Sequence, residues 1–123
     1  TTFGGEALSL AAALATLEVM EAENVPDVLA RRGRALMAGF NAAAEQHGVE
    51  AVAYGYPQRP VLRFREPAER AAFLAGMVRR RVLTQGYFNL TLAHDDRCIA
   101  ETVDAFGAAL AEARQAAAAS VVA

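Results

Sequence analysis

The sequence predicts an α+β domain in which a small antiparallel sheet carries helices on one face and a long apolar helix precedes it. Three observations predict this fold class. Apolar residues recur at helical spacing in four segments, alternating apolar residues mark short strands between them, and Gly and Pro punctuate the boundaries. The 123 residues fit one domain, and an apolar content of 54% is enough to build a core.

The first predicted helix runs from Glu6 to Glu23 without an internal Gly or Pro. Its apolar residues form two stripes: Leu10, Leu14 and Leu17, and Leu8, Ala12, Ala15 and Val19. A helix that is apolar on nearly all sides is normally buried on all sides. A domain of this size can hardly surround it, so we expect a larger body of protein to pack against it. The chain therefore reads as a piece.

A break and a second helix follow the first. Asn24 is expected to cap the second helix, while Pro26 suits its first turn and Asp27 complements its dipole. The helix ends at His47–Gly48, because glycine is the usual residue of the left-handed turn after a helix. Its expected inward residues are Leu29, Leu36, Phe40 and Ala43, and its outward ones Arg31, Arg34, Asn41 and Glu45.

The spacing of apolar residues changes from helical to alternating between Val49 and Arg65, which predicts two strands. Residues 55–60 are predicted to form the turn between the two strands. A third helix opens at Glu66–Pro67, with Phe73, Leu74, Met77 and Val78 on its buried side, and closes at a solvated run of arginines, residues 79–81.

A third strand and a last helix complete the expected order. Residues 82–93 are extended and apolar around a kink at Gln85–Gly86, which predicts the strand. Asp95 or Asp96 then caps the helix. The expected inward residues of that helix are Ile99, Val103, Phe106 and Leu110.

Charge and composition exclude several classes of function. A net charge of −2 gives no general attraction to nucleic acid, and no apolar run is long enough to cross a membrane. A single cysteine, Cys98, makes no internal disulfide, so we expect a reducing, cytoplasmic compartment. All 12 basic residues are arginines, and the absence of lysine excludes Schiff-base chemistry by this chain alone. No metal site is predicted.

The first six residues combine two hydroxyls, a glycine pair and a helix start: Thr1, Thr2, Phe3, Gly4, Gly5 and Glu6. Glycines let backbone N–H groups approach a ligand, and a helix N-terminus favours an anion such as phosphate. The other interpretation is an ordinary threonine cap followed by a glycine turn.

Two stretches resemble the class III aminotransferases, which are fold-type-I enzymes that use pyridoxal phosphate. Residues 2–5 (TFGG) with residues 11–19 (AAALATLEV) are similar to the start of that family's C-terminal region. Residues 86–95 (GYFNLTLAHD) are similar to the closing segment of the glutamate-1-semialdehyde aminomutase-like branch. The resemblance covers residues 1 to about 110, with the elements in the same order. It implies a phosphate-edge loop and an interdomain helix in residues 1–23, and a C-terminal small domain in residues 24–123.

The resemblance implies a role for the threonines. In this family a threonine before the Gly-Gly pair reaches across the dimer to the cofactor phosphate of the neighbouring subunit, and Thr2 holds that position here. Thr1 is a possible second donor. The family's Schiff-base lysine would precede Thr1, so the isolated chain is expected to be inactive. The implied partners are the protein's own large domain, a second subunit of a homodimer, and an amino-acid or amino-ketone substrate.

The sequence departs from the family at two places. Glu6–Ala7 stands where the family commonly has Asn-Pro after the glycine pair. Residues 88–94 lack the arginine with which many class III transaminases organise the site for amino-acid carboxylates, which favours the aminomutase-like branch.

Three residues near the kink, Tyr87, Phe88 and Asn89, are candidates for a substrate mouth, because an extended segment after a glycine is where a small domain would face the cleft. Three others are expected to be structural: His94 before a helix cap, His47 at a helix end, and Cys98 as a small packing residue.

The alternative to an enzyme part is a stand-alone α+β module that binds a partner without chemistry. The two interpretations differ in what they require of the first helix. In a stand-alone module this helix must fold back and cover the sheet, whereas in an enzyme part it needs a missing large domain.

Overall fold

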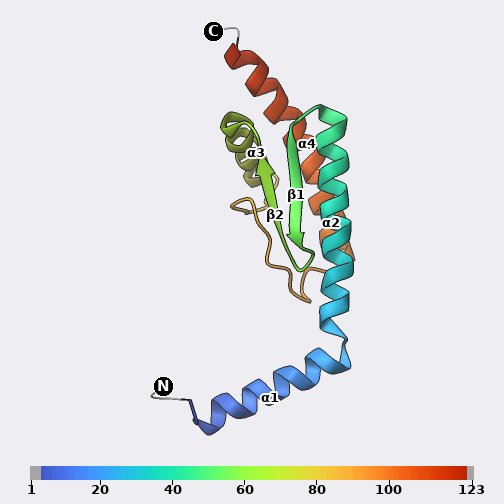
Figure 1. The fold of residues 1–123 in the computed structure, drawn as a ribbon, viewed down its shortest axis with the longest axis vertical. Helices are drawn as coiled ribbons and strands as arrows, with labels where there is room; N and C mark the ends of the chain where they lie inside the picture. The colour runs from blue at the N-terminus through green and yellow to red at the C-terminus, as the bar shows by residue number, and fades with distance from the viewer. Residues whose placement is uncertain (1–3, 122–123) are drawn as a thin grey trace.

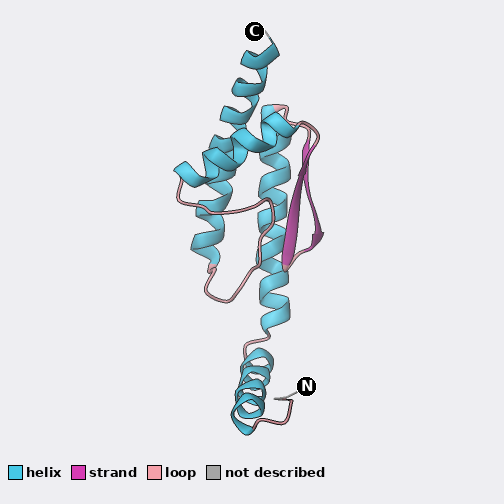
Figure 2. Ribbon diagram, turned by 90° about the vertical axis from the view of Figure 1, so that its left-hand side faces the viewer, coloured by secondary structure: helices cyan, strands magenta, loops and turns pink. Residues whose placement is uncertain are grey.

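The chain forms four helices and a two-stranded antiparallel sheet within residues 4–121, the part that the computed structural model describes. The helices are α1 (Ala7–Ala22), α2 (Val25–His47), α3 (Pro67–Arg79) and α4 (Asp96–Val121), and the strands are β1 (Ala51–Tyr56) and β2 (Arg59–Phe64). Figure 1 shows the order of these elements along the chain. In Figure 2 the helices that pack on the sheet all lie on one of its faces. The predicted α+β class, with helices on one face of the sheet, is confirmed.

The two strands form a hairpin whose faces differ in character. Ala53 and Leu62 are opposite each other and buried against the helices. On the outer face the register pairs Val52 with Arg63, Tyr54 with Val61, and Tyr56 with Arg59. Because strand residues alternate between faces, this period-two pattern places aromatic and cationic side chains together on the outer face.

Aromatic rings from three helices make the centre of the core. Phe40 of α2 meets Phe106 of α4 edge to face, with ring centroids 5.3 Å apart, and meets Phe73 of α3 at 5.7 Å. All three side chains are fully buried, as predicted, and edge-to-face pairs add to the stabilisation that burial gives. The expectation for Val78 was wrong, because this side chain is 56% exposed. The side of α3 that meets α4 contains Gly76 instead, whose smallness allows close approach to Ala109.

At the two ends of α2 and at one of its polar residues, the structure agrees only in part with the prediction. Gly48 adopts the expected left-handed conformation, with φ of 64°. Asn24 does not cap the helix through its side chain, which donates to Asp27 instead (3.0 Å). Asn41, expected to face outward, is half-buried, and its Oδ1 accepts a hydrogen bond from the backbone N–H of Ala53 (2.7 Å). Asn41 therefore ties α2 to β1.

The predicted third strand is not a regular strand. Its residues touch β2 through one isolated antiparallel bridge, between Val61 and Tyr87. Three backbone hydrogen bonds accompany the bridge: Leu62 N–H to Gly86 O, Phe88 N–H to Pro60 O, and Leu90 N–H to Gln58 O. Pro60 has no N–H to return a bond to Phe88, so the ladder cannot continue in the regular way. The segment nevertheless lies beside β2 as an irregular edge.

Helices α3 and α4 are joined by a charged contact that the sequence interpretation missed. Arg79 and Arg80, expected to be solvated, both form ion pairs with Glu112 of α4, Arg80 at 2.6 Å. These arginines hold the pKa of Glu112 at about 2, with the hydrogen bond from Arg80 as the largest cause. Asp95 is the residue that caps α4, since its Oδ1 accepts from the N–H of Cys98 (2.8 Å).

Helix α1 lies apart from the rest of the fold. Both views show it projecting from the start of α2, away from the sheet and from α3 and α4. Every residue of α1 is exposed, including Leu8 at 76% and Leu14 at 60%. The long helix expected to be buried is thus uncovered in this chain by itself, and it does not fold back over the sheet.

Candidate functional site

The first candidate site is the segment before α1. Thr1 and Thr2, the predicted phosphate ligands, lie outside the described residues. What is described begins at the glycine pair, where Gly4 and Gly5 are exposed and a Cβ on Gly5 would meet nothing within 4 Å. The backbone here is therefore open to a ligand.

The N-terminus of α1 already holds a carboxylate. Glu6 is the N-cap, and its side chain accepts from the N–H groups of Leu8 (2.8 Å) and Ser9 (2.7 Å) and from the hydroxyl of Ser9 (2.8 Å). These bonds, that from Leu8 N–H first, lower the pKa of Glu6. A phosphate near this point would therefore bind to groups ahead of the helix rather than to the helix end itself. Glu6, where the sequence departs from the family, thus occupies the helix end that a phosphate could otherwise use.

These groups fit one end of pyridoxal phosphate and not the other. Hydroxyls and open glycine N–H groups are donors that suit a phosphate. No residue of the chain suits the aldehyde end, because the sequence contains no lysine.

The second candidate is a hollow of about 320 Å³ along the irregular edge beside β2. It brings together all three residues expected at a substrate mouth, with His94; its lining is Leu83, Thr84, Gln85, Tyr87, Phe88, Asn89 and His94. Phe88 also packs edge to face on Phe106 at 5.8 Å, so it joins the hollow to the core. The Thr84 hydroxyl donates to the carbonyl of Tyr87 (3.0 Å), which holds the loop in a fixed shape.

Two arginines on the outer face of the sheet were missed by the sequence interpretation. The guanidinium of Arg59 lies over the ring of Tyr87, 5.7 Å from its centroid, and that of Arg63 lies over Tyr54 at 5.6 Å. Neither arginine has a carboxylate partner among residues 4–121. The alternation of Tyr54 and Tyr56 in one strand with Arg59 and Arg63 in the next was the available signal.

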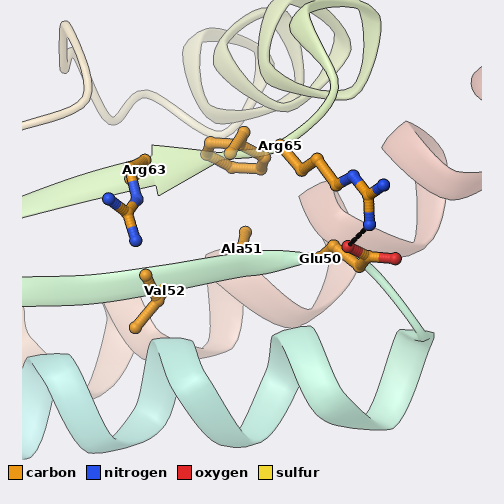
Figure 3. A pocket seen from close by; sticks show the side chains of 6 residues that line it. Glu50, Ala51, Val52, Arg63 and Arg65 are labelled. Atoms are coloured by element: carbon orange, nitrogen blue, oxygen red, sulfur yellow. Dashed lines mark hydrogen bonds and ion pairs between the residues drawn. The ribbon is translucent and has the colours of Figure 1, made fainter.

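Another hollow, of about 430 Å³, lies at the end of the sheet away from the hairpin turn (Figure 3). Its lining is Glu50, Ala51, Val52, Arg63, Phe64 and Arg65. Glu50 and Arg65 form an ion pair across its rim at 2.5 Å. The charge of Arg65 is thus already compensated, whereas Arg63 in the same lining has no carboxylate partner among residues 4–121.

The remaining candidates have local structural roles. Nδ1 of His94 accepts from the N–H of Thr91 (3.0 Å), which fixes the turn before α4. His47 lies in the last turn of α2, and Cys98 is half-buried in α4.

Within the described part of the chain no group of His, Cys, Asp and Glu is arranged to hold a metal ion. In the same part, none of the helices has the length and apolar character needed to span a membrane.

Comparison with known proteins places this fold. No family model matches the chain. Its sequence is 28% identical to that of the 3-aminobutyryl-CoA aminotransferase of Cloacimonas acidaminovorans over 94% of the chain. The FumI protein of Sphingopyxis sp. MTA144, solved in its PLP internal aldimine form, is 29% identical and matches 92% of the chain with a TM-score of 0.74. An omega-transaminase from Sphaerobacter thermophilus shares the fold over 72% of the chain, with a TM-score of 0.66 and 23% identity.

The fold is therefore that of the small domain of the pyridoxal-phosphate-dependent aminotransferases. The chain is similar in sequence and fold to one part of such proteins, in agreement with the resemblance found in the sequence. It spans 30% of the length of the Cloacimonas aminotransferase, 28% of the FumI chain and 24% of the omega-transaminase chain.

Proposed function

We propose that this chain is the C-terminal part of a class III aminotransferase or aminomutase that uses pyridoxal phosphate bound to a lysine outside these 123 residues. The observation that carries the proposal is the similarity to an aminotransferase over 94% of this chain but only 30% of the relative. A chain without lysine needs that remainder for the chemistry. The cofactor, once bound, supplies an electron sink for amino-group transfer.

We assign the contribution of this chain to cofactor binding to Thr2, with Thr1 as a second donor. Their hydroxyls would donate to phosphate oxygens, with the open backbone at Gly4 and Gly5 close by in the sequence. Because Glu6 occupies the end of α1, the phosphate contact rests on the residues ahead of it. The contact would be made to the cofactor of the neighbouring subunit in a homodimer.

The exposed helix α1 supports packing against a large domain and a second subunit. A stand-alone module would need α1 to cover the sheet, and the helix points away from it. For the substrate we propose an amino acid or amino ketone. The lack of arginine in residues 88–94 favours the aminomutase-like branch, and the single cysteine favours the cytoplasm.

The test uses the intact protein that contains this region. It should transfer amino groups only with pyridoxal phosphate present, and removal of the cofactor by dialysis should abolish activity until the cofactor is restored. Absence of transfer from any of a panel of amino acids and amines, with cofactor present, would contradict the function.

The assignment of Thr2 has its own test in the same protein. Thr2→Ala should weaken cofactor binding by about 10- to 150-fold, the value of one hydrogen bond to a charged group, while changing the melting temperature of the cofactor-free protein little. Thr16→Ala is the matched control, because the hydroxyl of Thr16 donates to the Ala12 carbonyl within α1. Equal cofactor affinity in the two variants would argue against Thr2.

A further inference from the structure

We propose that Arg59, stacked on Tyr87, binds the carboxylate of an acidic amino-group donor or acceptor next to the hollow that Tyr87 lines. The inference rests on the proposed aminotransferase function and assigns a specificity-determining residue to it.

The backbone places Arg59 next to Tyr87, which lines the hollow, whereas Arg59 itself is not part of that lining. The bridge between Val61 and Tyr87, together with the bond from Leu90 N–H to Gln58 O, sets Arg59 opposite Asn89. Strand alternation puts Arg59 on the same outer face as Val61, where no helix covers the sheet. Arg59 therefore lies on the strand next to residues 88–94. That segment has no arginine of its own.

Stacking holds the guanidinium without using its hydrogen-bond donors. Arg59 lies over the face of Tyr87 at 5.7 Å, and the Tyr87 hydroxyl in turn bonds to Oε1 of Gln85 at 3.3 Å. A stacked guanidinium keeps its in-plane N–H groups free, and their fork matches a carboxylate in bidentate geometry.

The charges around Arg59 favour an anion from outside. Within residues 4–121 Arg59 forms no ion pair with an acidic side chain, and Glu50, at the opposite end of the hairpin, is paired with Arg65. The hollow beside Tyr87 is lined by neutral polar groups, among them Thr84, Gln85 and Asn89, which donate or accept without repelling a carboxylate. Its volume of about 320 Å³ is that of a small-molecule site.

The experiment compares two amino donors in the intact protein with cofactor bound. 3-Aminobutyrate and 2-aminobutane present the same amine on chains of equal length, and only the first has a carboxylate. Arg59→Gln should lower kcat/KM for 3-aminobutyrate about 10- to 100-fold, mainly through KM, and leave 2-aminobutane within about twofold. Arg59→Lys, which keeps the charge but not the fork, should lie between.

Arg63→Ala is the matched control. It removes the same charge from the same face, about 13 Å along the strand from Arg59, and should leave both donors unchanged. A readout without turnover is competitive inhibition by butyrate, which should weaken in Arg59→Gln and persist in Arg63→Ala.

Equal effects of Arg59→Gln on both donors, no effect on either, or unchanged butyrate inhibition would overturn the inference while leaving the aminotransferase function in place. Use of 2-aminobutane but not 3-aminobutyrate by the parent protein would overturn it as well. A parent protein that transfers amino groups from no donor would overturn the proposed function, and the role of Arg59 with it.

Discussion

Gly33 is the point at which α2 touches the turn of the hairpin, and Gly33→Ala should loosen that turn. A Cβ on Gly33 would lie 1.6 Å from the carbonyl oxygen of Pro57 and 2.4 Å from its carbonyl carbon. Both are backbone atoms, so no side-chain rotation relieves the clash. The turn must withdraw by about 2 Å to reach ordinary van der Waals contact.

The expected loss follows from two opposing effects. Overpacking of this kind costs about 1–3 kcal/mol, here at the upper end because backbone must move. Alanine in place of glycine in a helix returns about 1 kcal/mol. The net loss is about 2 kcal/mol, or about 8 °C in melting temperature for a domain of this size. Withdrawal of the turn also endangers the bond from Gln58 Nε2 to Pro26 O (3.3 Å), which tethers the hairpin to the start of α2.

The assay is urea or thermal unfolding followed by circular dichroism, with Gly107→Ala as the matched control. Gly107 also lies in a helix, but a Cβ there meets nothing within 4 Å, so the control should gain about 1 kcal/mol. If Gly33→Ala proved as stable as the parent chain, the close approach of α2 to the turn would be refuted.

Two further predictions concern surfaces. The exposed apolar helix α1 should make the isolated chain self-associate. Leu8→Glu or Val19→Glu should reduce the association measured by light scattering. A chain that stays monomeric at high concentration, with both variants equally stable, would argue that α1 is no interface. Glu112, whose pKa in the folded protein is about 2, should contribute stability above its ordinary pKa of 4.5 and lose it as pH falls toward 2. The stability difference between parent and Glu112→Gln should therefore shrink in melting curves between pH 6 and pH 2, and a constant difference would contradict the ion pairs with Arg79 and Arg80.

The regular helices and the hairpin could be predicted from the sequence because local spacing determines them. Phe40 and Phe106 lie at helical intervals with other apolar residues, and Gly48 marks a left-handed turn by its residue type. The irregular third strand could not be predicted in this way. Its pairing fails because Pro60, which lies in another strand, has no N–H to offer. Asn41 was misplaced for the same reason, since its partner Ala53 lies beyond the end of the helix.

The residues of the candidate site could likewise be predicted only where the local sequence determines their place. Composition alone indicated that this chain has no lysine to hold a cofactor. The residues of the hollow, Tyr87 and Asn89, were predicted from their place after a glycine, whereas Arg59 was not, because its position over Tyr87 depends on the register between β2 and a segment far along the chain. The role of Thr2 stays a prediction.

The measurement that tests the central claim most directly is the position of the covalently bound cofactor in the intact protein. Borohydride reduction followed by peptide mass mapping should find pyridoxal phosphate on a single lysine outside residues 1–123. The isolated chain, treated in the same way, should acquire no stoichiometric adduct within its sequence, because it has no side-chain amine. An adduct mapped inside these residues, or an intact protein that retains no cofactor, would contradict the account.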